Sequence, residues 1–311
     1  MRSVLVAIVA ASWLGAAAMA QRSSSFRDRF NDYYEPVDAS GSAIRVDRRV
    51  GPYDKISFRT RGRLTVNQGR GTGVVSMDVD SAWAPYVETF VEDGRLVIRY
   101  KRPYYARCSG QGQRNSERCK LDVSITTDRL VGVELAGPGS IFMGRGQFRS
   151  DDLSISVAGP GDLSLKQEVS GTTRVHFAGP GKLRLTGSTQ TAVYDVTGPG
   201  TVLAEDFVTS DTRLTAVGPA TLNVHASDSL TGALNGPGTV VYSGNPSMVD
   251  VKTSRFFGSV RSVDGRDATA NRGEGANPFG APPRAPMPPS VDHFCGAPNN
   301  FDLQFRFPTN F

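Results

Sequence analysis

A short phrase recurs six times in this sequence, and it restricts the fold more than any other feature. Gly-Pro-Gly, or Gly-Pro-Ala in one copy, stands between two apolar alternations, as in "ISVAGPGDLSL". The first glycines of the copies are residues 137, 159, 179, 198, 218 and 236, which gives gaps of 22, 20, 19, 20 and 18. A period near twenty residues is typical of a stacked-repeat architecture.

Alignment of the six copies on this glycine indicates two strands in each repeat. Apolar side chains occupy four positions of each copy: the fourth and second residues before this glycine, and the fourth and sixth residues after it. The one exception is Gly232. The positions between them are mainly polar, and alternation with a period of two indicates a strand with one buried face. These repeats fill residues 131–243.

The chemistry of the motif predicts a corner between the two strands. Pro presets φ near −65° at the second position of a type II turn, and the second glycine is expected to take the positive φ of the third position. Because Ala220 replaces this glycine in one copy, we expect a strained or differently turned corner there. The predicted turn residues are Gly137, Pro138, Gly139, Gly159, Pro160, Gly161, Gly179, Pro180, Gly181, Gly198, Pro199, Gly200, Gly218, Pro219, Gly236, Pro237 and Gly238.

Two all-β architectures use such a unit: a single-stranded parallel β-helix with one repeat per turn, and an antiparallel β-meander or sandwich with hairpin tips. The β-helix is favoured because tight hairpins prefer type I′ or II′ turns. Repeat lengths also vary mainly after the second strand, where Phe148, Val169 and Phe207 indicate a third side. A twenty-residue circuit is roughly 66 Å around at about 3.3 Å per residue, enough for a three-sided coil.

The segments outside the repeats have different compositions. Residues 1–20 have the basic start, apolar centre and Ala-Met-Ala end of a secretory signal peptide, with cleavage after Ala20. Residues 21–48 form a polar leader or cap, and 49–135 alternate like short strands, with a hairpin predicted at Asp93-Gly94. No later segment is apolar enough to cross a bilayer as a helix, so an integral membrane protein is not expected.

The C-terminal part of the sequence divides into a linker and a tail. Residues 262–290 are rich in Pro, Gly and Ala and predict a disordered linker. In the tail, residues 291–311, apolar Phe301, Leu303, Phe305 and Phe307 alternate with polar residues. This pattern predicts a strand that docks on the coil or covers an open end; the alternative is a sorting or partner-binding tail that adds to a sheet edge.

Three cysteines occur, at 108, 119 and 295. In an oxidising compartment Cys108 and Cys119 are expected to form a disulfide, which would stabilise the fold by roughly 2–3 kcal/mol on loop-entropy arguments. Cys295 is left over, either free or paired with another chain. No CxxC motif is present to suggest a zinc or redox site.

The strands upstream and the repeated tips together resemble a known family, the GIN domain of auto-transporter adhesin heads, found in exported bacterial proteins. "GPYDKISFRTRGRLTVNQG", at 51–69, is similar to its opening, and "VEDGRLVIRY", at 91–100, to its central hairpin. The resemblance covers about 49–261. It implies a right-handed parallel β-helix, and it implies no catalytic activity and no catalytic residues.

One outward column carries residue types that could perform chemistry. Three residues before the motif glycine stand Glu134, Ser156, His176, Asp195, Thr215 and Ala233. In a stacked coil Ser156, His176 and Asp195 would form a ladder in the order of a nucleophile, a base and an orienting acid. An outward column is polar in any case, and no oxyanion hole is visible, so we predict no catalytic residues. No metal-ligand cluster and no cofactor-binding motif is present either.

The sequence therefore predicts an exported, non-enzymatic β-helix that acts in adhesion or interaction in the periplasm, at the cell surface or after secretion. A cell-envelope glycan or protein is the expected partner, whereas the interspersed charges, with a formal sum of +5, argue against nucleic acid. The alternative is a carbohydrate-active lyase or hydrolase on a β-helix. Candidate contact residues are Arg145, Arg149, Arg174, Lys182, Arg184 and Arg213.

Overall fold

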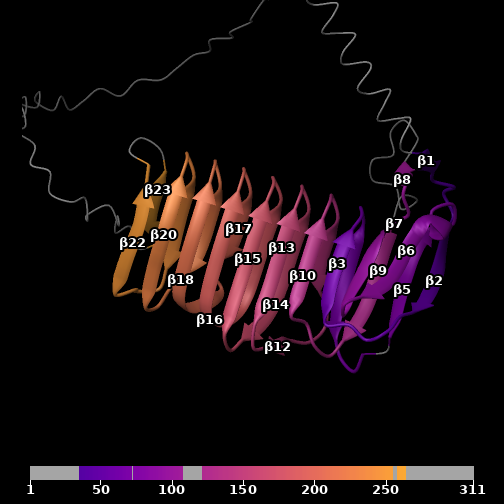
Figure 1. Cartoon of the computed structure of the whole chain (residues 1–311), viewed down its shortest axis with the longest axis horizontal. Helices are drawn as coiled ribbons and strands as arrows, with labels where there is room; N and C mark the ends of the chain where they lie inside the picture. Colours follow the sequence, from indigo (N-terminus) through magenta and orange to yellow (C-terminus); the bar gives the residue numbers. More distant parts are fainter. Residues whose placement is uncertain (1–34, 72, 108–120, 255–257, 264–311) are drawn as a thin grey trace, which may run out of the picture. The chain divides into compact units, whose positions relative to one another are not determined.

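The computed structural model describes residues 35–71, 73–107, 121–254 and 258–263. The signal peptide, the Cys108–Cys119 pair, Cys295, most of the linker and the Phe-rich tail lie outside these residues. The described strands form a sheet of 21 strands and a separate pair of strands, β1 and β8 (Figure 1). No described helix is long and apolar enough to span a membrane.

The described elements are short, apart from two long strands, β16 and β18. They are β1 (Glu35–Asp38), β2 (Ala43–Arg49), β3 (Lys55–Arg59), β4 (Arg63–Gln68), β5 (Val74–Asp80), the 3-10 turn η1 (Ala84–Tyr86), β6 (Val87–Glu92), β7 (Arg95–Tyr100), β8 (Tyr104–Arg107), β9 (Leu121–Thr127), β10 (Gly132–Ala136), β11 (Ser140–Met143), β12 (Phe148–Ser150), β13 (Leu153–Ala158), β14 (Asp162–Val169), β15 (Thr172–Ala178), β16 (Lys182–Thr197), β17 (Thr201–Ala204), β18 (Phe207–Val217), β19 (Thr221–His225), β20 (Ser229–Asn235), β21 (Thr239–Ser243), β22 (Met248–Thr253) and β23 (Ser259–Ser262).

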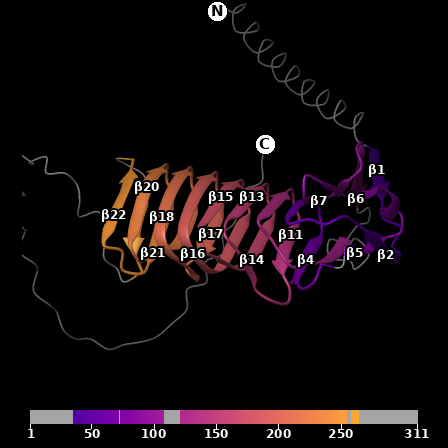
Figure 2. The same ribbon diagram turned by 60° about the horizontal axis from the view of Figure 1, so that its bottom comes forward.

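The strands stack in parallel as the walls of a three-sided coil. The first wall contains the strands before each motif, in the order β7, β3, β10, β13, β15, β16, β18, β20 and β22. The second wall contains the strands after it, and Figure 2 brings β4, β11, β14, β17 and β21 of this wall into view. A short third wall joins β12 to parts of β14, β16 and β18. The parallel β-helix is therefore confirmed, and the antiparallel alternative is wrong.

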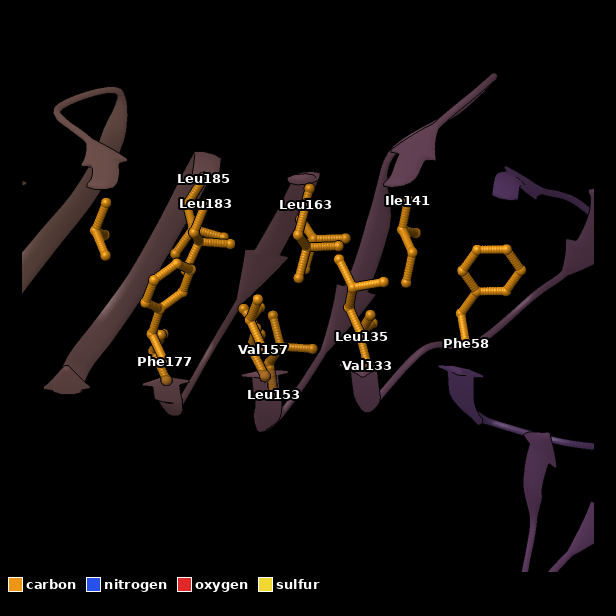
Figure 3. Close-up of a cluster of buried hydrophobic side chains, with 14 of the residues drawn as sticks. Phe58, Val133, Leu135, Ile141, Leu153, Val157, Leu163, Phe177, Leu183 and Leu185 are labelled. Carbon is orange, nitrogen blue, oxygen red and sulfur yellow. The ribbon is translucent and has the colours of Figure 1, made fainter. Parts of the chain in front are cut away.

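The register places equivalent residues of successive repeats directly above one another. Ile155 pairs with Val175 on the first wall, and Leu163 pairs with Leu183 on the second. Side chains from the two walls meet in the interior, where Figure 3 shows them as facing rows. Among the four apolar columns, all positions are buried except Met143 and Gly232, which are half-buried. Each fully buried apolar side chain stabilises the fold by about 1.5–3 kcal/mol, so these columns are its main source of stability.

The third wall also contributes to this core. Phe148 and Phe207 are each 1% exposed and Val169 is 4% exposed, as expected from the apolar residue that recurs in this part of the repeats. Gln167 lies in the same column as Phe148 and is buried as well. Its Nε2 atom donates hydrogen bonds to the carbonyl oxygen of Leu130 and to Ser150.

The corners differ from the predicted type II turn in the roles of the two glycines. The positive φ belongs to the first glycine of every copy, with values between +98° and +131°. The second glycine has no positive φ, and it is buried in each copy. A Cβ there would meet the backbone of the previous turn, so the position needs a small residue for close approach rather than for an unusual φ. The proline between them is exposed.

The expectation of a strained corner at Ala220 was wrong for the same reason. Ala220 does not occupy the left-handed region, which is where a Cβ would cause strain. Its carbonyl oxygen accepts a hydrogen bond from the Thr239 amide at 2.9 Å, and the equivalent bond from Thr221 to Gly200 measures 3.0 Å. The Ala220 corner therefore keeps the turn-to-turn hydrogen bonding of its neighbour.

The order of the turns at the N-terminal end does not follow the sequence. β3 and β4 lie between β7 and β9 on one side and β10 and β11 on the other. The chain therefore forms its first turn with β3 and β4. The segment from β5 to β9 folds back and adds the turn that contains β7 and β9 on one side of the first. β10 and β11 then continue the coil on the other side.

Antiparallel strands cover this end of the core. β2 pairs with β5, and β5 pairs with β9, both antiparallel. β6 and β7 form the predicted hairpin, in which Asp93 and Gly94 both have positive φ, as a type I′ turn requires. Trp83 is fully buried beneath these strands, and its indole N–H donates a hydrogen bond to the carbonyl oxygen of Val37.

Candidate functional site

The central outward column of the first wall runs along the coil. Strand pairing aligns Ser57, Glu134, Ser156, His176, Asp195, Thr215 and Ala233. The strands alternate with a period of two, so these residues point away from the core while their neighbours point into it. Neighbouring members come from adjacent strands of a sheet, about 4.8 Å apart, which is close enough for direct contacts.

The middle of this column contains the Ser–His–Asp set. His176 Nδ1 lies 3.5 Å from Asp195 Oδ2, and the two side chains are 59% and 56% exposed. Within the described residues, neither ring nitrogen of His176 is hydrogen-bonded to Ser156. The pair lies on an open face, without a wall that would exclude water from a reaction. Across the part of the chain that the structure describes, no three His, Cys, Asp or Glu residues are grouped as a metal site.

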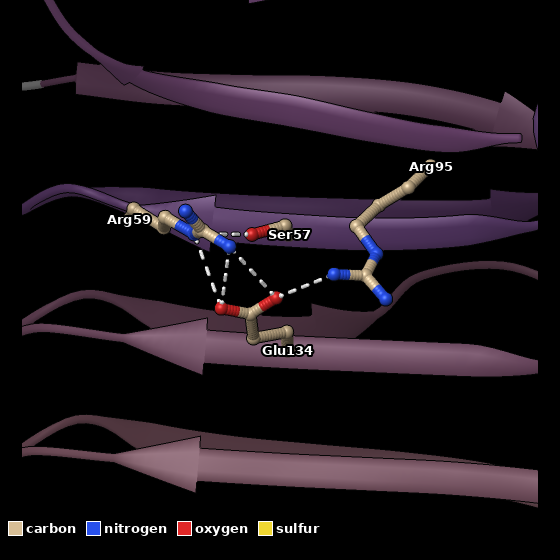
Figure 4. A network of polar contacts seen from close by, with 4 residues as sticks. All are labelled: Ser57, Arg59, Arg95 and Glu134. Carbon is tan, nitrogen blue, oxygen red and sulfur yellow. Dashed lines mark hydrogen bonds and ion pairs between the residues drawn. The ribbon is translucent and has the colours of Figure 1, made fainter. Parts of the chain in front are cut away.

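A denser polar network lies at the N-terminal end of the same column (Figure 4). The carboxylate of Glu134, on β10, accepts hydrogen bonds from Arg59 Nε at 3.1 Å and from Arg95 at 3.3 Å. Arg59 Nε also donates to the Ser57 hydroxyl at 2.9 Å. Glu134 is 23% exposed, whereas the arginines are 42% and 45% exposed. One carboxylate thus fixes two guanidinium groups that still have N–H donors open to solvent.

Two adjoining hollows flank this network and share Lys55 and Arg95. The larger, about 330 Å³, has a floor of small residues that includes Gly132, Ser154 and Ser156. The stem of Lys55 crosses Gly132, since a Cβ on this glycine would lie 3.0 Å from Lys55 Cγ. The ammonium group of Lys55 has no ion-pair partner among the described residues. We refer to the two hollows together as the Lys55 groove.

The second hollow, about 200 Å³, extends the groove over β6 and β7. Its lining includes Phe90, Arg59 and Arg99. The guanidinium carbon of Arg99 lies 5.0 Å from the centre of the Phe90 ring, a cation–π contact, and Arg99 Nε donates to Glu88 at 3.0 Å. The Lys55 groove therefore combines an aromatic ring, guanidinium groups held by carboxylates, and an ammonium group that no described carboxylate pairs with.

The basic residues expected to contact a ligand do not form one patch. Arg174 and Arg213 lie on the first wall, Lys182 and Arg184 on the second, and Arg149 on the third. Arg149 pairs with Glu168 at 2.8 Å beside a hollow of about 620 Å³. This hollow is lined by Arg129, Arg149, Asp151 and Glu168, so its charges cancel.

Sequence reasoning missed the groove because its basic residues come from strands outside the repeats. Lys55 and Arg59 occupy alternate positions of β3 with Ser57 between them, and Arg95 and Arg99 occupy the same phase of β7. That shared outward phase was visible in the sequence. The out-of-order turn that brings β7, β3 and β10 side by side was not.

Comparisons with known proteins agree with this fold. The family model described as "Putative auto-transporter adhesin, head GIN domain" matches residues 52–246. A structure titled a putative adhesin from Bacteroides fragilis is similar with a TM-score of 0.62 at 20% identity, covering 73% of this chain and 100% of that one. A structure titled a putative lipid binding protein from Parabacteroides distasonis gives 0.58 at 20% identity, covering 74% and 100%. No curated protein matches the chain.

Proposed function

The chain belongs to the GIN-domain family of adhesin heads, and from this premise we propose that it is a non-enzymatic scaffold that binds a cell-envelope glycan in the Lys55 groove. The observation that carries this proposal is the pair of adjoining hollows that share Lys55 and Arg95. The rest of the coil fixes the backbone that bears Lys55 and Arg95, because β3 and β7 are each paired on both sides.

The chemistry of the groove suits a sugar. Guanidinium and carboxylate groups offer paired donors and acceptors that match neighbouring hydroxyl groups, and the Phe90 ring offers an apolar face. Glu134 holds Arg59 and Arg95 in place before a ligand arrives, which reduces the entropy lost on binding.

The charge of the groove points to a glycan with few acidic groups. Lys55, Arg59, Arg95 and Arg99 are accompanied by Glu92, Asp93 and Glu134, so the lining has only a small positive excess. A polyanion such as nucleic acid would need a much stronger positive field. Lys55, which has no carboxylate partner in the part of the chain that the structure describes, would select one carboxylate or phosphate on the sugar.

Export fits the same proposal. The signal sequence at 1–20 would place the mature chain, from Gln21, in the periplasm, at the cell surface or in the medium. Glycans of the cell envelope are accessible in all three places. The competing proposal is that the same coil is a carbohydrate-active enzyme. In that case the chain would cleave the glycan that it binds.

The test is binding of the mature chain to a glycan array, with analysis of the bound sugars for cleavage products. Lys55→Ala should weaken binding at least about tenfold, a change of about 1.4 kcal/mol. The matched control is Lys182→Ala, an exposed lysine on the second wall, which should bind like the original chain.

The same experiment distinguishes the competing proposals. Because one structural neighbour is titled a lipid binding protein, vesicles with anionic headgroups form a second arm. Binding to vesicles alone, equal loss in both lysine variants, or no binding to any glycan would overturn the proposal. Release of sugar fragments would favour the enzyme.

A further inference from the structure

The two hollows of the Lys55 groove run across the strands rather than along one of them. Their lining residues come from neighbouring strands in the order β6, β7, β3, β10 and β13. Neighbouring strands lie about 4.8 Å apart, so this series extends over roughly 19 Å. The groove is therefore longer than a single sugar ring, and its long axis follows the axis of the coil.

The two ends of the groove differ in chemistry. Phe90 pairs with Val97, and both side chains line the smaller hollow. Val97 is only 4% exposed, so it lies at the bottom of this hollow. Ser154 and Ser156 line the far end of the larger hollow, on β13. One end of the groove is therefore apolar and aromatic, and the other has small hydroxyl side chains.

Charged groups lie where the two hollows meet. Arg59 lines the smaller hollow, Glu134 lines the larger, and Arg95 lines both. Figure 4 shows the Glu134 carboxylate between the two guanidinium groups. Lys55 also lines both hollows. A ligand that fills the whole groove must therefore be a chain with rings on either side of this junction.

The next strand sets the length of the groove. On β15, Arg174 pairs with Ser154 and His176 pairs with Ser156, so two long side chains follow the two serines in the same outward columns. His176 is 59% exposed and stands above the wall. Each ring of an extended pyranose chain advances it by about one strand spacing, so the groove from β6 to β13 accommodates about four rings.

We propose that the glycan bound in the Lys55 groove is a linear chain of about four rings that lies along the coil axis, across the strands. One neutral ring packs on Phe90 and Val97, an acidic sugar lies at Lys55, and another neutral ring covers Ser154 and Ser156. Aromatic side chains bind the apolar face of a ring, and an ammonium group binds a carboxylate. This inference rests on the proposed function and adds the length, the direction and the order of the sugars.

Titration calorimetry of the mature chain with oligosaccharides of increasing length tests the proposal. The probes are hyaluronan oligomers of two, four and six sugars, in which a uronic acid alternates with an N-acetylated sugar. The tetramer should bind at least about tenfold more tightly than the dimer, and the hexamer within about twofold of the tetramer. The chitin tetramer, which has no carboxylate, should bind at least about tenfold more weakly than the hyaluronan tetramer.

Variants at both ends of the groove test the direction of the chain. Phe90→Ala and Ser154→Trp should each reduce the gain in affinity from two to four sugars to less than about threefold. The matched control for the first is Phe142→Ala on the second wall, where Arg63 lies over the ring as Arg99 lies over Phe90.

The matched control for Ser154→Trp is Thr221→Trp, at an exposed outward position of the second wall. Both control variants should bind like the original chain. Far-UV circular dichroism reports whether each variant retains the folded coil.

The outcomes separate this inference from the function on which it rests. Equal affinity for two and four sugars, in a chain whose binding is still weakened by Lys55→Ala, would overturn the inference alone. The same conclusion would follow if the chain bound another glycan on the array but no hyaluronan oligomer. No binding to any glycan, or binding that Lys55→Ala leaves unchanged, would overturn both proposals.

Discussion

The carbonyl oxygen of Gly139 lies 2.4 Å from the point where a Cβ on Gly161 would stand. The same relationship joins Gly161 to Gly181 in the next turn, at 2.2 Å. Contacts this short do not occur between a real Cβ and an oxygen. The buried glycine of each corner is therefore required by the short distance between successive turns. The exposed proline beside it fixes its own φ and so sets the direction of the chain at the corner.

The first prediction concerns this close approach. Gly161→Ala should lower the free energy of unfolding by about 3 kcal/mol, because the new methyl group forces two turns apart. The matched control is Ala220→Gly at the equivalent corner, which removes one buried methyl group and should cost about 1 kcal/mol. Urea unfolding at neutral pH measures both values. Equal losses in the two variants would show that spacing between turns is not what selects glycine.

The second prediction concerns Asp80, a buried carboxylate at the end of β5. Burial raises its pKa, but amide hydrogen bonds from Ser40, Gly41 and Ala82 and one from the Ser40 hydroxyl outweigh burial and hold the pKa below its usual value. Asp80→Asn should therefore destabilise the fold by about 2 kcal/mol at neutral pH.

The pH dependence of Asp80 follows from the direction of its shift. A carboxylate with a lowered pKa in the folded state contributes stability above its unfolded pKa, about 3.9, and loses it as the pH falls through the folded value. The difference between the original chain and Asp80→Asn should therefore shrink below about pH 4. A difference that stays constant from pH 6 to pH 3 would contradict this account.

The third prediction concerns Tyr194, whose hydroxyl is buried in the coil without a hydrogen-bond partner among the described residues. Tyr194→Phe should raise the free energy of unfolding by about 1 kcal/mol, because a desolvated hydroxyl is removed and the ring stays. Burial also raises the pKa of this phenol. Stability should consequently fall as the pH rises above the unfolded pKa of about 10, and less so in Tyr194→Phe. Chemical unfolding at pH 7 and pH 10.5 provides the comparison.

The fourth prediction concerns the Ser156, His176 and Asp195 column. Both members of the His176–Asp195 pair are more than half exposed, so His176→Ala should change the free energy of unfolding by no more than about 0.5 kcal/mol. The mature chain should hydrolyse neither ester nor peptide substrates. Should activity be found, its loss in Ser156→Ala would establish the column as catalytic, and its persistence would place the reaction elsewhere.

The fifth prediction concerns Cys108 and Cys119. We expect them to form one disulfide in the exported chain, which intact mass before and after reduction would detect. Cys108→Ser should cost about 2–3 kcal/mol of stability by the loop-entropy argument. A chain purified from the periplasm with both thiols free would rule this pairing out.

The sequence by itself determined the coil. Its twenty-residue period, the apolar columns and the hairpin at Asp93-Gly94 are local patterns, and parallel stacking is the arrangement that buries all four columns at once. The third wall could be predicted for the same reason, from the single apolar residue that recurs there.

Only the tertiary structure decided how the corners and the site are built. The roles of the two corner glycines depend on the turn below, which no single repeat contains, so Ala220 could be misjudged from the sequence. The Lys55 groove depends on the out-of-order turn that places β3 between β7 and β10. The sequence period indicates which residues share a face of a strand. The distances between the walls and between successive turns are defined only in the folded chain.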